Sequence, residues 1–374
     1  MSPIGNRPGH RIRRFLFRAL LVLVALYVAW AGWQIARFRR YESASTPDGR
    51  YELQGVYHMH SRFSDGRKTV DEIAAVAAAA KLDFLIFTDH GKPNVASLDA
   101  QGRKSGVLVL AGSELSVNRG HLVALAFDRP AAGRTFSPDA EIAAAEVRAL
   151  NGFTVIAHPY AKIRWSWGGP ADYAGLEIID GDSMIRAHVL SRLPYYPLLF
   201  VKPSLAVLSL IDPPDRNLAK WDRLLAQRPE RPFLGFYSAD AHFLYGAIFP
   251  ALHLHVLLDA PPSPDFEAAR AQIFDALRRG AFYSAIDGAA DARGFRFGRD
   301  GAALRVAAPF PFAHETAIIH DGRVILRSPE TDVTAPLEGR GVYRAEVFLR
   351  ARTPLDGRVP WIASNPIAID KDGR

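Results

Sequence analysis

The 374-residue sequence contains no cysteine. A chain without Cys has no disulfide scaffold, no Cys₄ zinc site and no thiol nucleophile, so any transition-metal site in it must use His and carboxylate ligands. The sequence also lacks a G-x-S-x-G nucleophile elbow, which argues against a serine hydrolase of the α/β-hydrolase type. Avoidance of Cys fits an exported protein, in which a stray thiol is oxidised, although it does not prove export.

Residues 1–40 contain no acidic residue. They contain eight arginines, which are Arg7, Arg11, Arg13, Arg14, Arg18, Arg37, Arg39 and Arg40. The whole chain has 46 basic and 39 acidic residues, and removing these eight leaves 38 basic residues against 39 acidic ones. The net charge of +7 therefore comes from the N-terminus, and the rest of the chain has no excess of basic residues for binding nucleic acid. We expect no nucleic-acid partner.

An uncharged apolar run occupies residues 19–36. Eighteen helical residues span about 27 Å, close to the hydrocarbon thickness of a bilayer. Tyr27, Trp30 and Trp33 lie in its second half, as in the aromatic belt of a membrane helix. We expect a basic cytoplasmic tail at 1–18, a transmembrane helix or uncleaved signal anchor at 19–36 and a tether at 37–50. The alternative is a cleaved signal peptide with Ala29-Trp30-Ala31 as its cleavage site.

Both interpretations place the body of the protein outside the cytoplasm. Five arginines precede the apolar run and three follow it, which favours a cytoplasmic N-terminus. The predicted location is therefore the inner membrane, crossed once, with the folded body on the periplasmic side. Nothing in the sequence indicates an oligomeric state.

Short apolar strands alternate with helices from residue 51 onward. We expect strands at 51–57, 82–88, 107–111, 121–127, 153–157, 176–179 and 233–237, and helices at 68–81, 138–151, 217–227 and 265–279. Most of these strands end at a polar cluster, as in a β/α barrel, where the active site lies at the carboxyl ends of the strands. The expected fold class is therefore α/β, with a barrel domain at 51–290.

Two regions do not follow this alternation. Residues 291–374 contain short alternating segments separated by Gly and turn pairs, which predict a small antiparallel β-sandwich domain. Residues 183–232 contain several prolines and an apolar stretch at 195–211. This stretch is interpreted as core, as a lid over the barrel mouth, or as a surface that faces a membrane.

The histidines at the predicted strand ends are the main candidates for chemistry. His58 and His60 are two residues apart, so a strand through both would place their side chains on one face, and Asp65 follows on the next turn. Further candidates at the barrel mouth are His90, Glu114, His121, His158, Asp240 and His242. So many buried imidazoles without a metal would leave unpaired donors and would repel one another when protonated. The pattern therefore predicts a metal centre.

In their order along the chain, these motifs resemble those of the PHP (polymerase and histidinol phosphatase) superfamily. The resemblance is carried by His58-Met59-His60 with Ser64-Asp65-Gly66, Thr88-Asp89-His90, Glu114, Ala157-His158-Pro159 and Ser238-Ala239-Asp240-Ala241-His242. It covers residues 51–290. The membrane-tethered layout and the stretch from Trp361 to Ile367 (WIASNPI) are similar to the carbaryl-hydrolase-like metallohydrolase branch.

The resemblance implies a distorted, TIM-like (β/α)₇ barrel that holds two or three divalent ions, Zn, Mn or Fe. The implied metal ligands are His58, His60, Asp65, His90, Glu114, His121, His158, Asp240 and His242. Glu114, His158, Asp240 and His242 are the implied catalytic residues. A Cys or His that trinuclear members carry between the last two motifs has no clear counterpart, since His188 is the only histidine there.

Three further residues are candidates for supporting roles. Asp89 is a candidate orienter of an imidazole, Glu177 ends a strand at the mouth and could touch substrate or a ligand, and Lys92 could hold a phosphate. The expected reaction is hydrolysis of a small phosphomonoester or phosphodiester by a hydroxide shared between metal ions. Alternatives are hydrolysis of a carboxylic or carbamic ester at the same centre, and a non-catalytic, metal-loaded binding protein.

Overall fold

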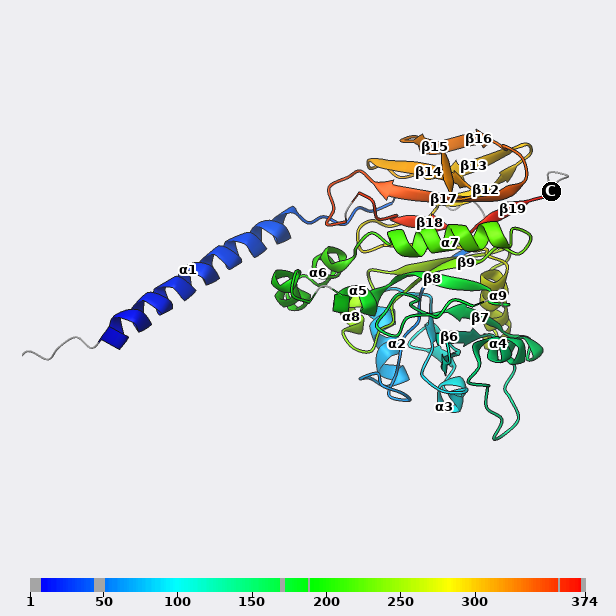
Figure 1. Ribbon diagram of the computed structural model, residues 1–374, viewed down its shortest axis with the longest axis horizontal. Helices are drawn as coiled ribbons and strands as arrows, with labels where there is room; N and C mark the ends of the chain where they lie inside the picture. The colour runs from blue at the N-terminus through cyan, green and yellow to red at the C-terminus, as the bar shows by residue number, and fades with distance from the viewer. Residues whose placement is uncertain (1–7, 44–50, 169–171, 188, 356, 371–374) are drawn as a thin grey trace, which may run out of the picture.

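The computed structural model describes residues 8–43, 51–168, 172–187, 189–355 and 357–370. Residues 1–7 of the expected cytoplasmic tail, 44–50 of the expected tether, and His188 lie outside the described residues. Within them the chain forms a mixed α/β body with one long helix, α1, extending away from it (Figure 1). Both the alternation of strands and helices and the long N-terminal helix agree with the sequence analysis.

The helices lie mostly where periodicity and capping residues predicted them. They are α1 (Pro8–Arg37), α2 (Val70–Ala79), α3 (Val95–Asp99), α4 (Ala140–Ala149), α5 (Gly181–Ala187), the 3₁₀ helix η1 (Leu193–Phe200), α6 (Pro203–Leu210), α7 (Asp215–Gln227), α8 (Tyr245–Ile248) and α9 (Phe266–Arg278). Thr69 caps α2 in a capping box with Glu72, and Asp139 and Asp265 cap α4 and α9. Each cap satisfies backbone N–H groups that a helix start leaves unpaired.

The strands form three sheets. They are β1 (Tyr51–Tyr57), β2 (Phe84–Phe87), β3 (Gly102–Lys104), β4 (Val107–Ala111), β5 (Ser113–Val117), β6 (Gly120–Leu125), β7 (Phe153–Ile156), β8 (Gly175–Asp180), β9 (Leu234–Ser238), β10 (His253–Leu258), β11 (Phe282–Ala285), β12 (Arg296–Asp300), β13 (Ala303–Ala307), β14 (His314–His320), β15 (Arg323–Ser328), β16 (Asp332–Pro336), β17 (Gly341–Leu349), β18 (Ile362–Ser364) and β19 (Ile367–Ile369). β5-β6-β7-β8-β9 form one sheet, β12-β13-β16 another, and the remaining strands an 11-stranded sheet.

The expected barrel is not a closed ring of hydrogen-bonded strands in the described part of the chain. Its strands divide between the five-stranded sheet and the β10-β1-β2-β4 part of the large sheet. Single bridges, Met59 to Ala241 and His90 to Glu114, join the two at the site. β5 and β6 are antiparallel to their neighbours, as is β10, which lies beside β1 and which the sequence analysis did not predict. An antiparallel neighbour needs no crossover helix, so the βα alternation does not indicate it.

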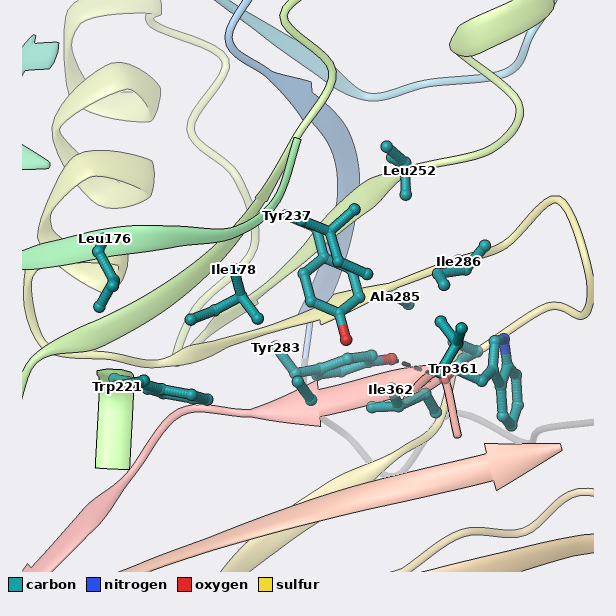
Figure 2. Close-up of a cluster of buried hydrophobic side chains, with 14 of the residues drawn as sticks. Leu176, Ile178, Trp221, Tyr237, Leu252, Tyr283, Ala285, Ile286, Trp361 and Ile362 are labelled. Atoms are coloured by element: carbon teal, nitrogen blue, oxygen red, sulfur yellow. Dashed lines mark hydrogen bonds between the residues drawn. The ribbon is translucent and has the colours of Figure 1, made fainter. Parts of the chain in front are cut away.

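The C-terminal strands do not form a β-sandwich that is separate from the rest. β12, β13 and β16 form their own small sheet, but β14, β15 and β17 join the large sheet because β18 pairs with both β11 and β17. The core is continuous across this junction, where Trp361 and Ile362 pack near Tyr237 and Tyr283 (Figure 2). A division into domains near residue 290 stays a prediction.

The motif at 361–367 has a structural role. Trp361 is fully buried and its indole Nε1 donates to the carbonyl of Ala290 at 3.0 Å. The Asn365 amide accepts from the backbone N–H of Gly235 and donates to the carbonyl of Phe282. These hydrogen bonds connect the C-terminal strands to β9 and β11.

The helix α1 is the one described helix that is long and apolar enough to cross a membrane, and its apolar window is almost fully exposed. A signal sequence near the N-terminus has the same properties. The second half of α1 contacts η1, where the phenol of Tyr27 donates to the carbonyl of Pro194 at 3.1 Å. The apolar stretch at 195–211 thus divides into η1, which touches α1, and α6, which is largely buried.

Candidate metal centre

The backbone at the ends of β1, β2, β7 and β9 brings the predicted ligands together. His60 N donates to the carbonyl of Ala241 at 3.0 Å, and Thr88 N donates to the carbonyl of Met59 at 2.9 Å. Because β6 is antiparallel to β7, its first residues lie beside the last residues of β7. His121 therefore reaches the same mouth as His158 although it begins its strand rather than ending it.

The strand expected at 51–57 is present as β1, but it does not continue through His58 and His60, the condition under which their side chains would share a face. β1 ends at Tyr57, and His58 has a positive φ of 65°. Simple alternation of side chains therefore does not apply there. The two rings nevertheless converge, with their centroids 5.3 Å apart, because Met59 makes a parallel bridge to Ala241 beyond the end of β1.

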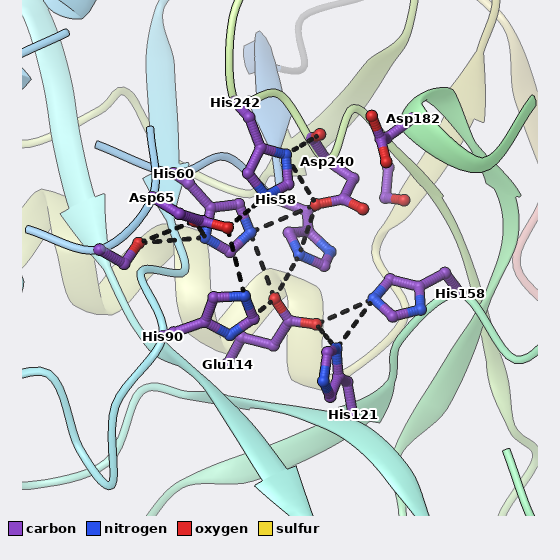
Figure 3. Close-up of polar contacts among 12 residues, drawn as sticks. His58, His60, Asp65, His90, Glu114, His121, His158, Asp182, Asp240 and His242 are labelled. Carbon is purple, nitrogen blue, oxygen red and sulfur yellow. Dashed lines mark hydrogen bonds and ion pairs between the residues drawn. The ribbon is translucent and has the colours of Figure 1, made fainter. Parts of the chain in front are cut away.

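Glu114 lies at the middle of the cluster (Figure 3). Its Oε1 is 2.8 Å from His121 Nδ1 and 2.9 Å from His158 Nε2. Its Oε2 is 3.2 Å from both His58 Nε2 and His60 Nε2. His90 Nδ1 lies 3.5 Å from the same Oε2, so one carboxylate faces five imidazoles, two on Oε1 and three on Oε2.

Asp240 and Asp65 complete the cluster on the other side. Asp240 Oδ1 is 3.3 Å from His58 Nε2 and 3.2 Å from His60 Nε2. Asp65 contacts the outer imidazoles, with Oδ2 3.3 Å from His242 Nε2 and 3.9 Å from His90 Nε2. All nine predicted ligands are therefore adjacent in space.

The donor atoms of this cluster group into three sets, each of which could hold one cation. The sets are His58, His60, Glu114 and Asp240; His60, Asp65, His90 and His242; and Glu114, His121 and His158. His60 and Glu114 each belong to two sets, so neighbouring cations would share ligands.

Several buried polar atoms of the cluster lack a hydrogen-bond partner, which tests whether a metal fits. These atoms are His60 Nε2, His90 Nδ1, His158 Nδ1 and Asp240 Oδ1. His60 Nε2 lies near two carboxylates, yet neither contact has hydrogen-bond geometry. A buried polar atom without a partner costs about 1–3 kcal/mol. Imidazole and carboxylate groups aimed at common points suit Zn, Mn or Fe, so the residues present fit divalent cations.

The electrostatics of the cluster favour bound positive charge. Burial alone would lower the pKa of His60, but the Asp240 and Glu114 carboxylates outweigh it and raise that pKa to about 9. Burial is outweighed in the same way at His158, where Glu114 and more distant Asp180 and Asp240 raise the pKa to about 10. The pKa of Glu114 is well below its usual value because His58, His121 and His158 outweigh its burial. A divalent cation can replace these protons.

Three of the predicted ligands have a strained backbone conformation. His58, His158 and Asp240 all have positive φ, at 65°, 23° and 45°. Such conformations are costly for residues other than glycine and persist where the surrounding structure imposes them, often at functional sites. His58 directly follows β1, and His158 and Asp240 lie two residues after the ends of β7 and β9.

Glu177 holds two of the ligands in place. It is fully buried in β8. Its Oε1 lies 2.6 Å from His58 Nδ1, and its Oε2 accepts from the backbone N–H of His158 at 2.7 Å. A carboxylate on Nδ1 selects the tautomer that leaves the Nε2 lone pair of His58 free for a metal. Of the roles that the sequence analysis left open for Glu177, the contact with a ligand is the one present.

Asp89 and Lys92 have different surroundings from those expected. Asp89 accepts from Ser61 and from Ser64 Oγ, at 2.7–2.8 Å, so it holds the loop that carries Asp65 rather than an imidazole. Lys92 is not among the described residues that line the cavity over the cluster.

A cavity of about 500 Å³ lies over the cluster. His90, Glu114, His121, His158, Asp240 and His242 line it, together with Tyr160, Lys162, Ile163, Arg164, Asp182, Ser183 and Arg186. Sequence reasoning missed the α5 residues Asp182, Ser183 and Arg186, because no strand-end motif marks them. Their one signal is position, since they follow directly on β8, which ends at Asp180.

Sequence reasoning also missed a second cluster. His253 and His255 on β10 and Asp287 are buried together, with Glu52 of β1 beside them. The spacing of the two histidines, H-x-H, repeats that of His58 and His60 and could have drawn attention to it.

No protein-family model matches this sequence, and no curated protein matches it. Among solved structures, a two-domain Bacteroides vulgatus protein described as containing a predicted PHP-like metal-dependent phosphoesterase is 16% identical, with a TM-score of 0.44 over 88% of this chain and 99% of that one. A Chromobacterium violaceum amidohydrolase, solved with bound sulfate and no metal, is 16% identical, with a TM-score of 0.33 over 50% of this chain and 87% of that one.

A third structure comes from Bifidobacterium adolescentis and is provisionally described as a metal-dependent phosphoesterase. It is 15% identical, with a TM-score of 0.34 over 51% of this chain and 88% of that one. None of these comparisons tests the carbaryl-hydrolase-like branch, which stays a prediction.

Proposed function

We propose that this chain is a metal-dependent hydrolase of the PHP type that cleaves small phosphate esters. One observation carries the proposal: the imidazoles of His58 and His60 converge on Glu114 and Asp240 beneath a cavity, with atoms that lack hydrogen-bond partners. A buried network of this kind is expensive without a cation to complete it.

The three sets of ligands would hold two or three divalent ions. When bound, such ions act as Lewis acids and lower the pKa of a coordinated water. The protein's own contribution is to place the ligands. Glu177 orients His58, and the bonds from Ser61 and Ser64 to Asp89 fix the loop that carries Asp65. Asp240, His242, Glu114 and His158 line the cavity and would face the substrate.

The rim of the cavity favours an anionic ester. Lys162, Arg164 and Arg186 line the cavity, and Arg186 forms an ion pair with Asp182. Cationic side chains near a metal centre attract and orient a phosphate group. A neutral carboxylic or carbamic ester, the second candidate substrate, would make no use of these cations. A non-catalytic, metal-loaded protein would not need a cavity over its ligands.

The test is an assay of the purified full chain with p-nitrophenyl phosphate, bis-p-nitrophenyl phosphate and p-nitrophenyl acetate. Each is tested with Mn²⁺ or Zn²⁺ and with a chelator, alongside elemental analysis. We expect phosphate-ester turnover that a chelator abolishes. Turnover of the acetate alone would favour the second candidate. Absence of any turnover, together with less than one metal ion per chain, would refute the proposal that this chain is a metal-dependent enzyme.

We also propose that α1 anchors the chain in the inner membrane, with the body on the periplasmic side. The exposed apolar helix and the arginines before it support this placement. The intact mass of the protein extracted from membranes tests it, since cleavage after Ala31 would remove most of α1.

A further inference from the structure

The segment between α5 and α6 exposes a group of large apolar side chains. This apolar patch consists of Val189, Leu190, Leu193, Phe200 and Val201. Leu190 is 87% exposed, Phe200 82% and Val201 68%. Single exposed apolar residues are ordinary, but a contiguous group on a short segment marks a surface that contacts something else.

The patch is held outward by residues that are buried beside it. Leu198 and Leu199, which precede Phe200, are buried in the main core, as are most residues of α6. Arg192 donates to the carbonyl of Ser209 at 3.0 Å and pairs with Asp212, which fixes the start of η1. The exposed side chains therefore lie on a supported structure, and their exposure is a property of the fold.

The 3₁₀ helix η1, which carries Leu193 and Phe200 of the patch, contacts the helix α1 through Pro194 and Tyr195. Tyr27 donates to the carbonyl of Pro194 at 3.1 Å, and Gln34 Nε2 donates to the Tyr195 phenol at 3.2 Å. The rings of Trp30 and Tyr195 meet edge to face, 5.2 Å apart. Figure 1 shows α1 leaving the body on the side where α5 and α6 lie.

The position of these contacts along α1 gives the depth of the patch. Tyr27 lies ten residues before Arg37, the last residue of α1, which corresponds to about 15 Å along the helix axis. The apolar run ends just before Arg37. If α1 spans a bilayer through residues 19–36, the Tyr27 contact with Pro194 lies near the middle of the apolar run. The Gln34 contact with Tyr195 lies about 5 Å from Arg37 along the helix axis, so η1 extends from the headgroup level into the hydrocarbon.

The chemistry around the patch is that of a membrane interface. Trp30 and Tyr195, which meet on the C-terminal half of α1, form an aromatic pair of the kind that occurs near headgroup level. Lys202 follows the patch directly and is exposed, with its Nζ 5.6 Å from the Phe38 ring. Apolar side chains bordered by a cation are typical of segments that lie in the interface.

We propose that the apolar patch, together with the second half of α1, forms a surface that inserts into the interfacial region of the lipid bilayer. The inference rests on the proposed anchoring by α1 and goes beyond it, because it gives the body a second, fixed contact with lipid. The bilayer is the occupant because the patch residues lie on and beside η1, which contacts α1, and the exposed apolar surface of α1 needs the same environment.

This surface also sets the position of the cavity. Asp182, Ser183, Arg186 and Ala187 of α5 line the cavity, and Val189 of the patch lies two residues after Ala187. Insertion of the patch therefore holds the cavity rim next to the lipid surface and limits how the body can rotate about the anchor.

The absence of Cys makes a direct test possible. Single variants Leu190→Cys and Phe200→Cys of the full chain are labelled with an environment-sensitive fluorophore and reconstituted into nanodiscs of phosphatidylethanolamine and phosphatidylglycerol. Matched controls are Ile142→Cys on α4 and Val324→Cys on β15, which are 54% and 47% exposed and lie far along the chain from the patch. Metal content and circular dichroism show that each variant is folded.

We expect the labels at 190 and 200 to emit at shorter wavelength than the controls and to lose fluorescence when the lipids carry a nitroxide near the headgroup end of the acyl chain. Equal quenching at all four positions would overturn the proposal. A shift to shorter wavelength without quenching by lipid would also overturn it, because a second copy or another protein would then cover the patch. Intact mass shows whether α1 has been removed from the protein. If the body without α1 does not sediment with vesicles of the same lipids, the proposal is also overturned.

Discussion

Two H-x-H pairs lie next to β1 and have different surroundings. His58 and His60 follow the end of β1, whereas His253 and His255 lie on β10, which pairs with β1 so that His255 is opposite Gln54. Both pairs are buried and both have a carboxylate between them, Glu114 in the first cluster and Asp287 in the second. By composition alone, either could be a metal site.

Hydrogen-bond saturation separates the two clusters. In the second, His255 Nδ1 contacts Glu52 and its Nε2 contacts Asp287, at 2.8 and 2.7 Å, while His253 contacts Asp287, Gln54 and the carbonyl of Phe249. In the first, four polar atoms lack such partners. The first cluster has polar atoms that remain available to bind a cation, whereas the histidines of the second cluster are already hydrogen-bonded within the protein. Residue types at a given spacing nominate a metal site, but unpaired lone pairs distinguish one.

Access separates them as well. Residues of the first cluster line the cavity of about 500 Å³, and residues of the second cluster do not. The comparison leads to a clear division of roles: loss of the first cluster should remove metal and activity, and loss of the second should remove stability.

The largest effect is expected from the centre of the first cluster. Glu114→Ala removes a carboxylate shared by two of the ligand sets, so we expect metal content to fall and activity to drop at least 100-fold, since loss of even an outer partner of a ligand costs about 10–100-fold. Elemental analysis and the phosphate-ester assay measure both. The matched control is Glu267→Gln, an exposed change on α9. Full metal content in Glu114→Ala would contradict the assignment.

The second cluster should respond in the opposite way. Asp287→Asn leaves His255 with a weakened partner and an unbalanced buried charge, so we expect a loss of about 3–5 kcal/mol in the free energy of unfolding, measured by urea denaturation. Metal content of the folded fraction should equal that of the unaltered protein. Loss of metal without loss of stability would mean that the second cluster is also a metal site.

A smaller, graded effect is expected from Glu177→Gln. An amide can still contact His58 Nδ1 but does not hold the tautomer as a carboxylate does, so we expect metal affinity and activity to fall about 10–100-fold. Unfolding stability in chelator should change much less than in Asp287→Asn. Equal activity of this variant and the unaltered protein would show that Glu177 serves packing alone.

The smallest effect is a pH dependence of stability from the second cluster. Burial opposes the charge on His255, but Asp287 and Glu52 raise its pKa from 6.5 to about 10. Its contribution is therefore complete below pH 6.5 and lost as pH rises toward 10. Burial is likewise outweighed at Glu52, where His255, Tyr283 and Arg296 lower the pKa from 4.5 to about 2. That contribution is complete above pH 4.5 and lost as pH falls toward 2.

Urea denaturation at a series of pH values from about 3 to about 10 checks this dependence. His255→Gln should flatten the alkaline decline, and Glu52→Gln should flatten the acid decline. If both variants keep the full pH dependence of the unaltered protein, other groups cause it.

Much of the site could be predicted from sequence because its residues occur in short motifs next to strongly apolar strands. All nine predicted ligands lie in one cluster, although His121 begins a strand and His58 lies outside one. Helices with clear caps, such as α2 after Thr69 and α9 after Asp265, were predicted closely. Local signals were sufficient there, since capping and periodicity depend on neighbouring residues.

The parts that could not be predicted depend on pairing between distant segments. The antiparallel place of β10 beside β1 decides that His253 and His255 meet Glu52 and Asp287. The pairing of β18 with β11 and β17 joins the C-terminal strands to the large sheet. Arg186 reaches the cavity because α5 directly follows β8, in a region without a recognisable pattern.

The sequence by itself determined the donor chemistry of this protein: without Cys, a cluster of imidazoles and carboxylates at strand ends is its one route to a transition-metal centre. Only the tertiary structure decided which histidines have lone pairs left for a metal and which are already paired. The reason is physical. Hydrogen-bond satisfaction depends on groups that are far apart in the chain and adjacent in space, as Glu177 is to His58 and Asp287 is to His255.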